Sequence, residues 1–575
     1  MARAPIFPND HHIDSSSGYF SDDEMASKRQ PTDREKRWLA AHPEQVDLER
    51  DGAIIETIIR QMPAMDSSDT SHINQLIHRI GKGRLTKDQV LKGYRQLVDR
   101  GDLAPDPQVL KRLQLKPIRT ISGVAPVAVL TKPHPCPGEC VFCPDFPEMP
   151  KSYLPDEPGA LRAEQLGFDP FLQTERRIRA LSCVGHSTDK IELIVLGGTW
   201  SSYPPTYQEW FLRRCFDAMN MCDSSTLDEA HERNQTASHR NVGLVVETRP
   251  DQITPDEIVR LRELGVTKVQ IGVQSLDDEI LAKNGRGYTV DRIREAFRLL
   301  RTGGFKIHAH WMPNLLGATP ASDKKDFARL WEDRSFLPDE LKIYPCSLVP
   351  GTKLYEIWKT GAYTPYSDSV LIDLVADCKA RVPQYCRITR VMRDIPKGNI
   401  AAGCTRANLR QLVGRALFDR GMACNCIRCR EIRKEPVDPS SLVLNDFVYE
   451  TDTTKEFFLS FDTDVRGSTS RIAAFLRLSL PQGQYPLPPE FVDDLSGAAM
   501  IREVHVYGPA IDLGEKDPEY AQHGGLGTRL LAWAEEIARD VGYSRIAVIS
   551  AVGTREYYRA RRFTLGRYYM TKDLK

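Results

Sequence analysis

The sequence predicts an α/β protein whose centre is a partial (β/α)6 TIM-like barrel, with a helical region before it and a smaller α+β domain after it. After Pro117, short apolar runs alternate with longer helical stretches, as in the repeated β-then-α units of a parallel sheet. About six such units occur without a Rossmann glycine pattern, which favours a barrel. After about Ser440, apolar runs surround one helical stretch, 526–541, which indicates a separate domain.

Length and composition limit the classes of protein that are possible. The 575 residues suggest about three or four domains, and 78 basic residues balance 78 acidic ones, so any basic surface must be local. Because the sequence has no run of 18 or more apolar residues and no apolar leader, we expect neither a membrane span nor a secretion signal. Closely spaced members of the 13 cysteines suit metals better than disulfides, which predicts a reducing, cytoplasmic compartment.

We divide the chain into five segments. Residues 1–45 are polar and are expected to be disordered. The next segments are a helical region, 46–115, and the barrel, 116–395. A cysteine-rich linker, 396–439, then joins the barrel to the α+β domain, 440–575.

Apolar residues at helical spacing predict two or three helices between about Leu48 and Asp102, one of them starting at the N-cap Thr86. Basic side chains are concentrated in the second half of this region. Such a patch suits contacts with phosphates, although a solvated helix face remains an alternative. The basic residues are Arg79, Lys82, Arg84, Lys87, Lys92 and Arg95.

The barrel strands are predicted from short apolar runs, and polar or small residues follow most of them. Since the carboxyl ends of parallel strands line the active site of a barrel, these residues are candidates for that site, although each alone is more often part of a turn. The polar stretch 222–241 is predicted to be a surface insertion. The predicted strands are 123–131, 191–200, 241–250, 266–275, 305–314 and 339–346. The residues at their ends include Gly197, Gly198, Glu247, Arg249, Gln274 and His310.

The stretch "HPCPGECVFCP" follows the first predicted strand and contains Cys136, Cys140 and Cys143 in a C-x3-C-x2-C spacing. Three close thiolates can fill three corners of a 4Fe–4S cluster and leave one iron free. A structural zinc site normally has four ligands, and only His134 is adjacent. A disulfide would leave one thiol over. The spacing alone leaves zinc and a cluster open and favours the cluster.

This motif, after the first strand of a partial barrel, resembles the signature of the radical S-adenosylmethionine (SAM) enzymes. The similarity is closer to one group of them, the catalytic subunits of the Elongator complex, in their prokaryotic form. Matching stretches run in family order from about Lys116 to the C-terminus. They include "PHPCPGECVFCP", "ETRPD", "IGVQS", "MRDIP", "REVHVYG", "QHGGLG" and "GTREYYR".

The resemblance implies roles for several residues at the strand ends. Gly197 and Gly198 would meet the methionine part of SAM. Glu247, Arg249 and Gln274 would lie near its ribose or its carboxylate. The family often has Gly-Gly-Pro after the last cluster cysteine, where this chain has "DFP", so cofactor contacts there could differ.

A second cysteine group, "CNCIRC", contains Cys424, Cys426 and Cys429. Its C-x-C-x2-C spacing in a polar loop suits a structural zinc site with one more distant ligand. Cys404 is the preferred fourth ligand, and Cys346 and Cys386 are alternatives. A second iron–sulfur cluster and buried free thiols also remain possible.

A glycine-rich turn opens the helical stretch of the C-terminal domain, where backbone N–H groups can bind a phosphate. The turn resembles the pyrophosphate loop of GNAT acetyltransferases, which implies acetyl-CoA. The resemblance also gives Tyr557 and Tyr558, with Lys151, roles in handling the acetyl group, whereas His505 is interpreted as a strand residue. The loop residues are Gln522, His523, Gly524, Gly525, Leu526, Gly527 and Thr528.

Together the two resemblances imply a tRNA-modifying enzyme. A radical derived from SAM would take hydrogen from the acetyl group of acetyl-CoA, and carbon 5 of the wobble uridine would become carboxymethylated. The basic patch would bind the tRNA. We expect an electron donor, a possible homodimer and independence of the other Elongator subunits. The alternatives are a protein lysine acetyltransferase with a structural iron–sulfur domain and a non-catalytic assembly platform.

Overall fold

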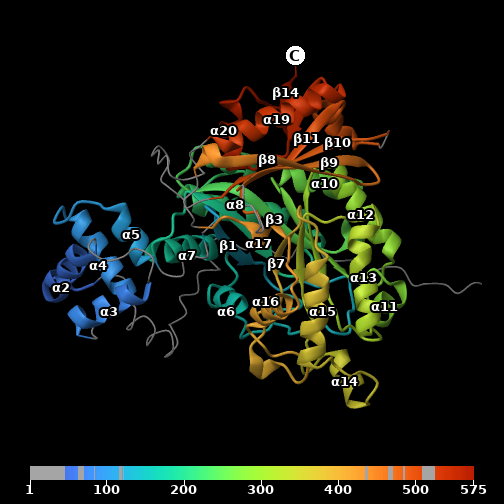
Figure 1. Cartoon of the computed structure of the whole chain (residues 1–575), viewed down its shortest axis with the longest axis horizontal. Helices are drawn as coiled ribbons and strands as arrows, with labels where there is room; N and C mark the ends of the chain where they lie inside the picture. Colours follow the sequence, from blue (N-terminus) through green and yellow to red (C-terminus); the bar gives the residue numbers. More distant parts are fainter. Residues whose placement is uncertain are drawn as a thin grey trace, which may run out of the picture.

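The computed structural model describes residues 46–62, 70–82, 85–114, 120, 122–433, 438–463, 470–483, 486–507 and 525–574. Figure 1 shows helices α2–α5 at one side of a central barrel, and the C-terminal sheet at the top. The predicted disorder of residues 1–45 concerns a segment outside the described residues.

The N-terminal helices have a hydrophobic core of their own, built from residues such as Ile55, Leu76 and Tyr94. Thr86 precedes α4 in a capping box with Gln89, which confirms it as the N-cap. The region contacts the barrel through α4 and α7. Its helices are α2 (Leu48–Gln61), α3 (Thr70–Gly81), α4 (Lys87–Asp99) and α5 (Pro107–Leu113).

The central sheet has seven parallel strands in sequence order, β1 to β7, and it forms an open, curled half-barrel. The strands are β1 (Ala125–Leu130), β2 (Lys190–Leu196), β3 (Arg240–Thr248), β4 (Lys268–Gln274), β5 (Lys306–Trp311), β6 (Glu340–Ile343) and β7 (Arg387–Arg390). Strands β1, β4, β5 and β6 lie within the predicted runs, and β2 and β3 each begin one residue earlier than predicted. The expected (β/α)6 count misses β7, because its sequence "RITR" is short and polar and gives no strand signal.

The helices of this unit lie between the strands in sequence or follow β7, and several of them cover the outer face of the sheet (Figure 1). They are α6 (Pro158–Gln165), α7 (Pro170–Cys183), α8 (Pro205–Asn220), α9 (Leu227–Asn234), α10 (Pro255–Glu263), α11 (Asp278–Lys283), α12 (Val290–Thr302), α13 (Pro320–Glu332), α14 (Lys353–Lys359), α15 (Asp368–Ala380), α16 (Leu409–Asp419) and α17 (Ile427–Arg430). In the described part of the chain, none is both long and apolar enough to span a membrane.

The stretch 222–241 is not the simple surface insertion that its polar composition predicts. It contains α9, on which Ala230 and Asn234 are fully buried and His231 is nearly so. Helix α9 packs on α8 and contacts residues 552–554 of the C-terminal domain. The buried side chain of Asn234 is paired with residues outside α9, because it bonds to Asn220 and to the carbonyl of His239.

The C-terminal domain is a seven-stranded mixed sheet in which β11 and β12 are the parallel pair. The predicted helix 526–541 is α19, with the same bounds. The elements are β8 (Leu442–Glu450), β9 (Thr454–Thr463), β10 (Ile472–Pro481), α18 (Val492–Leu495), β11 (Ala498–Val506), α19 (Leu526–Val541), β12 (Arg545–Val548), α20 (Arg555–Arg559), β13 (Thr564–Leu565) and β14 (Met570–Asp573).

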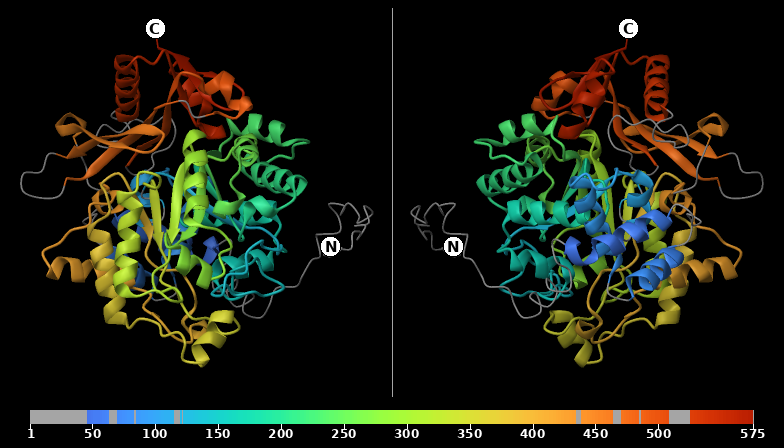
Figure 2. Two further views of the ribbon diagram at one scale, coloured as in Figure 1. Left: turned by 90° about the vertical axis from the view of Figure 1, so that its right-hand side faces the viewer. Right: turned by 90° about the vertical axis from the view of Figure 1, so that its left-hand side faces the viewer.

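This sheet packs on the end of the barrel at which the strands begin, and both views of Figure 2 show it above the barrel. Asp339, just before β6, accepts hydrogen bonds of 2.7 Å from two nitrogens of Arg502 on β11, and it pairs with Arg477 on β10 at 3.4 Å. These three side chains are buried. One hydrophobic cluster extends through both units, so they form a joint core.

Candidate active site

A cavity of about 840 Å³ opens at the carboxyl ends of the barrel strands. All three cysteines of the C-x3-C-x2-C motif line it. Residues at the predicted strand ends also line it, including Gly198, Glu247, Arg249, Gln274 and His310. The predicted cluster and SAM residues, drawn from widely separated parts of the sequence, therefore meet in one place.

The cysteine loop is anchored on both sides. The Cys136 sulfur lies 3.4 Å from Oγ1 of Thr199, which follows β2. On the other side, the backbone N–H of Val141 donates to the carbonyl of Asn284 at 3.2 Å. The Cys143 N–H donates to the carbonyl of Cys140 at 3.1 Å and closes a turn between these two thiols. The loop is thus fixed while its sulfurs face the cavity.

The glycines after β2 are required by the backbone. Gly197 and Gly198 have φ values of 134° and 100°, which L-residues with side chains rarely adopt. A Cβ on Gly197 would lie 1.9 Å from Oγ1 of Thr131. At the end of β4, Gln274 also has a positive φ, and its buried Oε1 has no hydrogen-bond partner among the described residues. A polar cofactor in the cavity would satisfy this atom, so the residues fit SAM.

The predicted cofactor residues Glu247 and Arg249 differ in how strongly their side chains are already paired within the protein. Oε2 of Glu247 lies 3.5 Å from the Tyr153 hydroxyl, and burial raises the pKa of this carboxyl group. Arg249 is already paired with Asp251, with Nε 2.9 Å from Oδ1. Its Nη1 lies 3.8 Å from the Cys140 sulfur, so Arg249 faces the cluster loop.

Two arginines at this cavity were not identified from the sequence. Arg286 follows α11 and lies 3.0 Å from the Cys140 sulfur. Arg393 belongs to the "MRDIP" stretch, and it donates to Ser152 at 2.8 Å and to Glu157 at 2.6 Å. Only the "MRDIP" resemblance offered a signal, because an isolated arginine has no distinctive spacing.

A smaller cavity, of about 240 Å³, lies at the opposite end of the barrel. Its barrel wall consists of residues at the beginnings of strands, such as Lys268, Lys306 and Arg387. Its other wall comes from β11, from the segment after β12, and from Tyr558. Pairing of these two strands ends at Ile501, although β11 continues to Val506, so the cavity occupies the gap between them.

The predicted acetyl-handling residues do not lie together. Tyr558 and His505 line the smaller cavity, whereas Lys151 lines the large cavity and pairs with Asp145 at 2.5 Å. His505 lies on β11, as predicted, and its buried Nε2 has no partner among the described residues. Burial lowers the pKa of His505 to about 4, so its ring is neutral at pH 7.

The N-terminus of α19 is a candidate phosphate site. Gly525 has a φ of 68°, and a Cβ on Gly527 would come within 2.7 Å of the Tyr557 hydroxyl. Nη2 of Arg561 donates to Oγ1 of Thr528 at 2.8 Å, which brings a cation to this helix end. The loop residues Gln522, His523 and Gly524 lie outside the described residues, while Leu526 is buried in the first turn.

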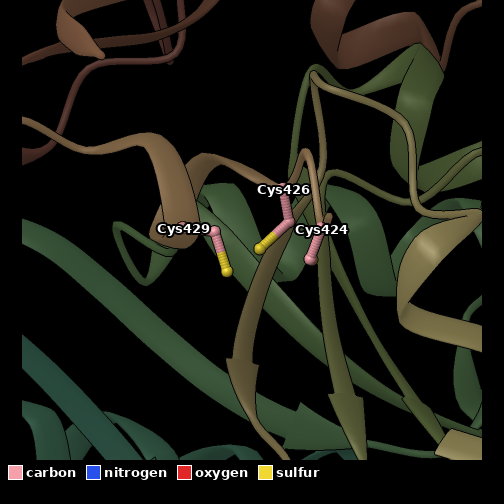
Figure 3. A group of neighbouring side chains, drawn as sticks. All are labelled: Cys424, Cys426 and Cys429. Carbon is pink, nitrogen blue, oxygen red and sulfur yellow. The ribbon is translucent and has the colours of Figure 1, made fainter. Parts of the chain in front are cut away.

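The sulfurs of Cys424, Cys426 and Cys429 all lie within 4.8 Å of one another (Figure 3). Hydrogen bonds from Cys424 and Cys429 lower the pKa of Cys426 well below its ordinary value. Three buried or half-buried thiols around one point, one of them prone to ionise, suit zinc, which prefers thiolate ligands.

The preferred fourth ligand, Cys404, is not a member of this group. Its thiol interacts with Asp368, and burial raises its pKa. Cys386 is electrostatically coupled to Cys426, and its carbonyl accepts a hydrogen bond from the chain next to Cys426. Cys346 lines the large cavity instead. Cys386 is likewise absent from the group of three, but its backbone contact beside Cys426 makes it the alternative to test, and Cys404 stays a prediction from sequence.

Three of the predicted phosphate-binding side chains are used within the protein. Lys87 is 9% exposed, and its Nζ lies 3.3 Å from the carbonyl of Gln114. Lys92 forms an ion pair within α4. Nη1 of Arg95 donates to the carbonyl of Ser182 on α7 at 2.5 Å. Helix α4 thus turns these side chains toward the protein.

Arg79 and Lys82, at the end of α3, are exposed, and Arg84 lies outside the described residues. The six basic residues therefore do not form one exposed helix face. The prediction of a nucleic-acid contact rests mainly on the turn between α3 and α4.

Comparison with known proteins identifies the class first. Residues 134–325 match the Radical SAM superfamily, and residues 338–418 match the Radical_SAM C-terminal domain. The barrel with its cysteine loop is thus a radical SAM domain, which implies a 4Fe–4S cluster and SAM.

The most similar relatives define a particular family within the radical SAM proteins. The "tRNA uridine(34) acetyltransferase" of Dehalococcoides mccartyi is 44% identical over 79% of this chain and 99% of its own length. Human "Elongator complex protein 3" is 37% identical over 81% of this chain and 87% of its own. The solved archaeal Methanocaldococcus infernus Elp3 has a TM-score of 0.67 and 38% identity, covering 79% of this chain and all of that one. The chain therefore belongs to the family of tRNA uridine(34) acetyltransferases and Elongator complex protein 3.

Proposed function

We propose that this enzyme carboxymethylates carbon 5 of the wobble uridine of tRNA, using acetyl-CoA as the source of the two-carbon unit. A 4Fe–4S cluster held by Cys136, Cys140 and Cys143 would bind SAM. When reduced by an electron donor, these cofactors supply a carbon radical that can take hydrogen from an unactivated methyl group. The relatives' printed names, which specify uridine 34 of tRNA, support the substrate.

The observation that carries the proposal is the pair of cavities at the two ends of one barrel. The large cavity contains the three cysteines. The smaller one lies between the separated strands β11 and β12, beside Tyr558. Thr389 lines both cavities, so they approach each other inside the barrel.

The positions of Arg561 and Gly527 support acetyl-CoA as the second cofactor. Both lie at the first turn of α19, where free N–H groups and a cation would bind the diphosphate. The acetyl end would then enter the gap between β11 and β12, close to Tyr558. Lys151 lies in the other cavity, so we place it with the cluster and not with the thioester.

The wall of the smaller cavity argues against protein lysine acetylation, the main alternative. The barrel side of this cavity is lined by Lys306, Glu340 and Arg387, and Lys306 pairs with Glu503 of β11 at 2.5 Å. A protein lysine entering from the barrel side would have to pass this charged wall. We therefore place the acceptor, tRNA, at the mouth of the large cavity, with Arg79 and Lys82 as its outlying phosphate contacts.

The proposal is tested by anaerobic reconstitution with iron, sulfide and a reductant, followed by SAM, acetyl-CoA and tRNA. We expect 5′-deoxyadenosine by chromatography and 5-carboxymethyluridine by nucleoside mass spectrometry. Cys140→Ser should abolish both products, because one corner of the cluster loses its ligand. Cys222→Ser is the matched control, since Cys222 is exposed and lines neither cavity.

Two results would contradict the proposal. Acetylation of a protein substrate that survives Cys140→Ser would support the acetyltransferase alternative. Absence of any SAM cleavage in the reconstituted wild type would favour an assembly platform. Running the assay with the isolated chain also tests whether it acts without other Elongator subunits, and gel filtration tests the expected homodimer.

A further inference from the structure

Arg286 is a buried cation that lies against the cysteine loop. It is 4% exposed, and its Nη1 lies 3.0 Å from the sulfur of Cys140. Within the described part of the chain, no carboxylate pairs with it, whereas nearby Arg249 has Asp251. A buried guanidinium without a counter-ion is costly. The Cys140 sulfur is the cysteine atom that this guanidinium meets, and a cluster bound through Cys140 would supply the missing negative charge.

The guanidinium of Arg286 is held in one orientation. Its Nη2 donates to the carbonyl of Gly272 on β4 at 2.8 Å, and its Nε lies 2.8 Å from the Tyr288 hydroxyl. That hydroxyl donates in turn to the Gly272 carbonyl. Arg249 fixes the backbone, because its Nη2 donates to the carbonyl of Arg286 at 2.7 Å. Arg286 therefore reaches Cys140 from a rigid support.

Two glycines allow this approach. A Cβ on Gly138, inside the cysteine loop, would lie 1.8 Å from Nη1 of Arg249. A Cβ on Gly285 would lie 2.7 Å from the carbonyl oxygen of Glu139. Since Gly285 also has a φ of 66°, any other residue there would be strained. The loop and the arginine turn thus fit closely around Cys140.

We propose that Arg286 is a positioning residue that orients the Cys140 thiolate and raises the reduction potential of the cluster bound to it. This inference rests on the cluster in the proposed function but not on tRNA or acetyl-CoA. A cluster becomes more negative when it accepts an electron, so a fixed, desolvated positive charge beside one of its ligands favours the reduced state.

The test is an EPR-monitored redox titration of the reconstituted protein, without SAM, acetyl-CoA or tRNA. In Arg286→Met we expect the ratio of reduced to oxidised cluster at a fixed potential to fall at least tenfold, which is a shift of about 59 mV for one electron. Arg286→Lys keeps the charge and should shift the ratio less than threefold. The matched control is Lys353→Met, which removes an exposed cation from Glu139 in the same loop and should cause no shift.

Further results of this titration would each bear on the proposal. If Arg286 bound only the carboxylate of SAM, Arg286→Met would weaken SAM binding and leave the potential unchanged, which would overturn the proposal. If that variant fails to retain iron, Arg286→Gln replaces it, because an amide removes the charge and keeps hydrogen-bond donors beside Cys140 and the Gly272 carbonyl. A potential in Arg286→Gln equal to that of wild type would then overturn the proposal. A wild type that binds no 4Fe–4S cluster would remove both this inference and the proposed function, whereas loss of tRNA modification alone would leave this inference standing.

Discussion

Arg561 is one residue whose position can be tested directly. Its guanidinium lies over the ring of Tyr557, 3.5 Å from the centroid, and bonds to Thr528 in the first turn of α19. It is therefore held where the diphosphate of acetyl-CoA would bind. Charge-assisted hydrogen bonds of this type contribute about 1.5–3 kcal/mol.

We predict that Arg561→Met weakens acetyl-CoA binding by about tenfold or more, measured by isothermal titration calorimetry. Arg559→Met is the control, because Arg559 pairs with Glu556 and Gln235 and faces away from α19. If Arg561→Met and wild type bind acetyl-CoA with equal affinity, the diphosphate does not bind at the N-terminus of α19.

The second cysteine group gives a prediction for metal content. We expect about one zinc per chain by elemental analysis, and its loss in Cys426→Ser, because a tetrahedral zinc site does not tolerate the loss of one thiolate from three. Among the fourth-ligand candidates, Cys386→Ser should lower zinc retention during dialysis against a chelator, and Cys404→Ser should not. The opposite result would restore the assignment made from sequence.

At the scale of elements, the cap of α4 determines how well the N-terminal helices hold together. In its capping box, the Thr86 side chain accepts from the backbone of Gln89, and the Thr86 N–H donates to Oε1 of Gln89 at 2.8 Å; alanine would remove the first of these bonds. We predict that Thr86→Ala lowers the free energy of local unfolding of α4 by about 1 kcal/mol. Amide exchange in α4 should then be about fivefold faster, measured by hydrogen exchange with mass spectrometry.

The control for this prediction is Thr57→Ala in the neighbouring helix α2. The Thr57 hydroxyl bonds only to the carbonyl one turn earlier, and alanine has the higher helix propensity. Exchange in α2 should therefore not increase. Faster exchange in both variants would show that threonine contributes by packing and not by capping.

Elements with a strong periodic pattern could be predicted from the sequence, and the exceptions have physical causes. Helix α19 was predicted with its observed bounds, because its apolar stripe begins after a glycine turn and ends at Gly542. Strand β7 could not be predicted, since it has four residues and its pairing with β6 supplies what its sequence lacks. Helix α9 was missed because its polar residues are buried through pairs with distant segments, such as the bond between Asn234 and Asn220.

Among the site residues, too, some could be predicted from the sequence, and others depend on tertiary contacts. The glycines and polar residues at strand ends were found because a parallel barrel brings those ends together, whatever their separation in sequence. Arg286 was missed because its role depends on a contact with Cys140, 146 residues away. Lys87 and Arg95 are predicted to bind phosphate because the sequence gives their charge but not the direction in which their side chains point. Only the packing of α4 shows that they face inward.

At the scale of the whole molecule, charged residues join the barrel to the C-terminal sheet. Glu503 on β11 lies 2.5 Å from Nζ of Lys306 and 2.9 Å from Nε of Arg477. Burial raises the pKa of Glu503, but these two cations outweigh it and lower the pKa to about 2. The folded pKa is below the unfolded value of about 4.3, so this carboxylate stabilises the fold fully above pH 4.3 and ceases to do so as the pH falls towards 2.

We therefore predict that Glu503→Gln lowers the Tm at pH 7, and that the difference from wild type shrinks between about pH 4.5 and 2. A pKa lowered by about two units corresponds to a contribution of about 3 kcal/mol from this carboxylate to the free energy of unfolding. Thermal scans by circular dichroism across this range measure the effect. Glu535→Gln, which breaks a pair with Lys572 within the C-terminal domain, is the control and should give a smaller, more uniform decrease. A difference for Glu503→Gln that does not change with pH would contradict the prediction.

The ion pairs of Asp339 have a consequence for the evolution of the chain. Asp339 belongs to the barrel, and its partners Arg477 and Arg502 belong to the other sheet, all three being buried. A recombination event that exchanged either half for that of another protein would leave buried charges of one sign without their partners. The barrel and the C-terminal sheet are therefore expected to be inherited as a single block, with substitutions on one side matched by compensating substitutions on the other.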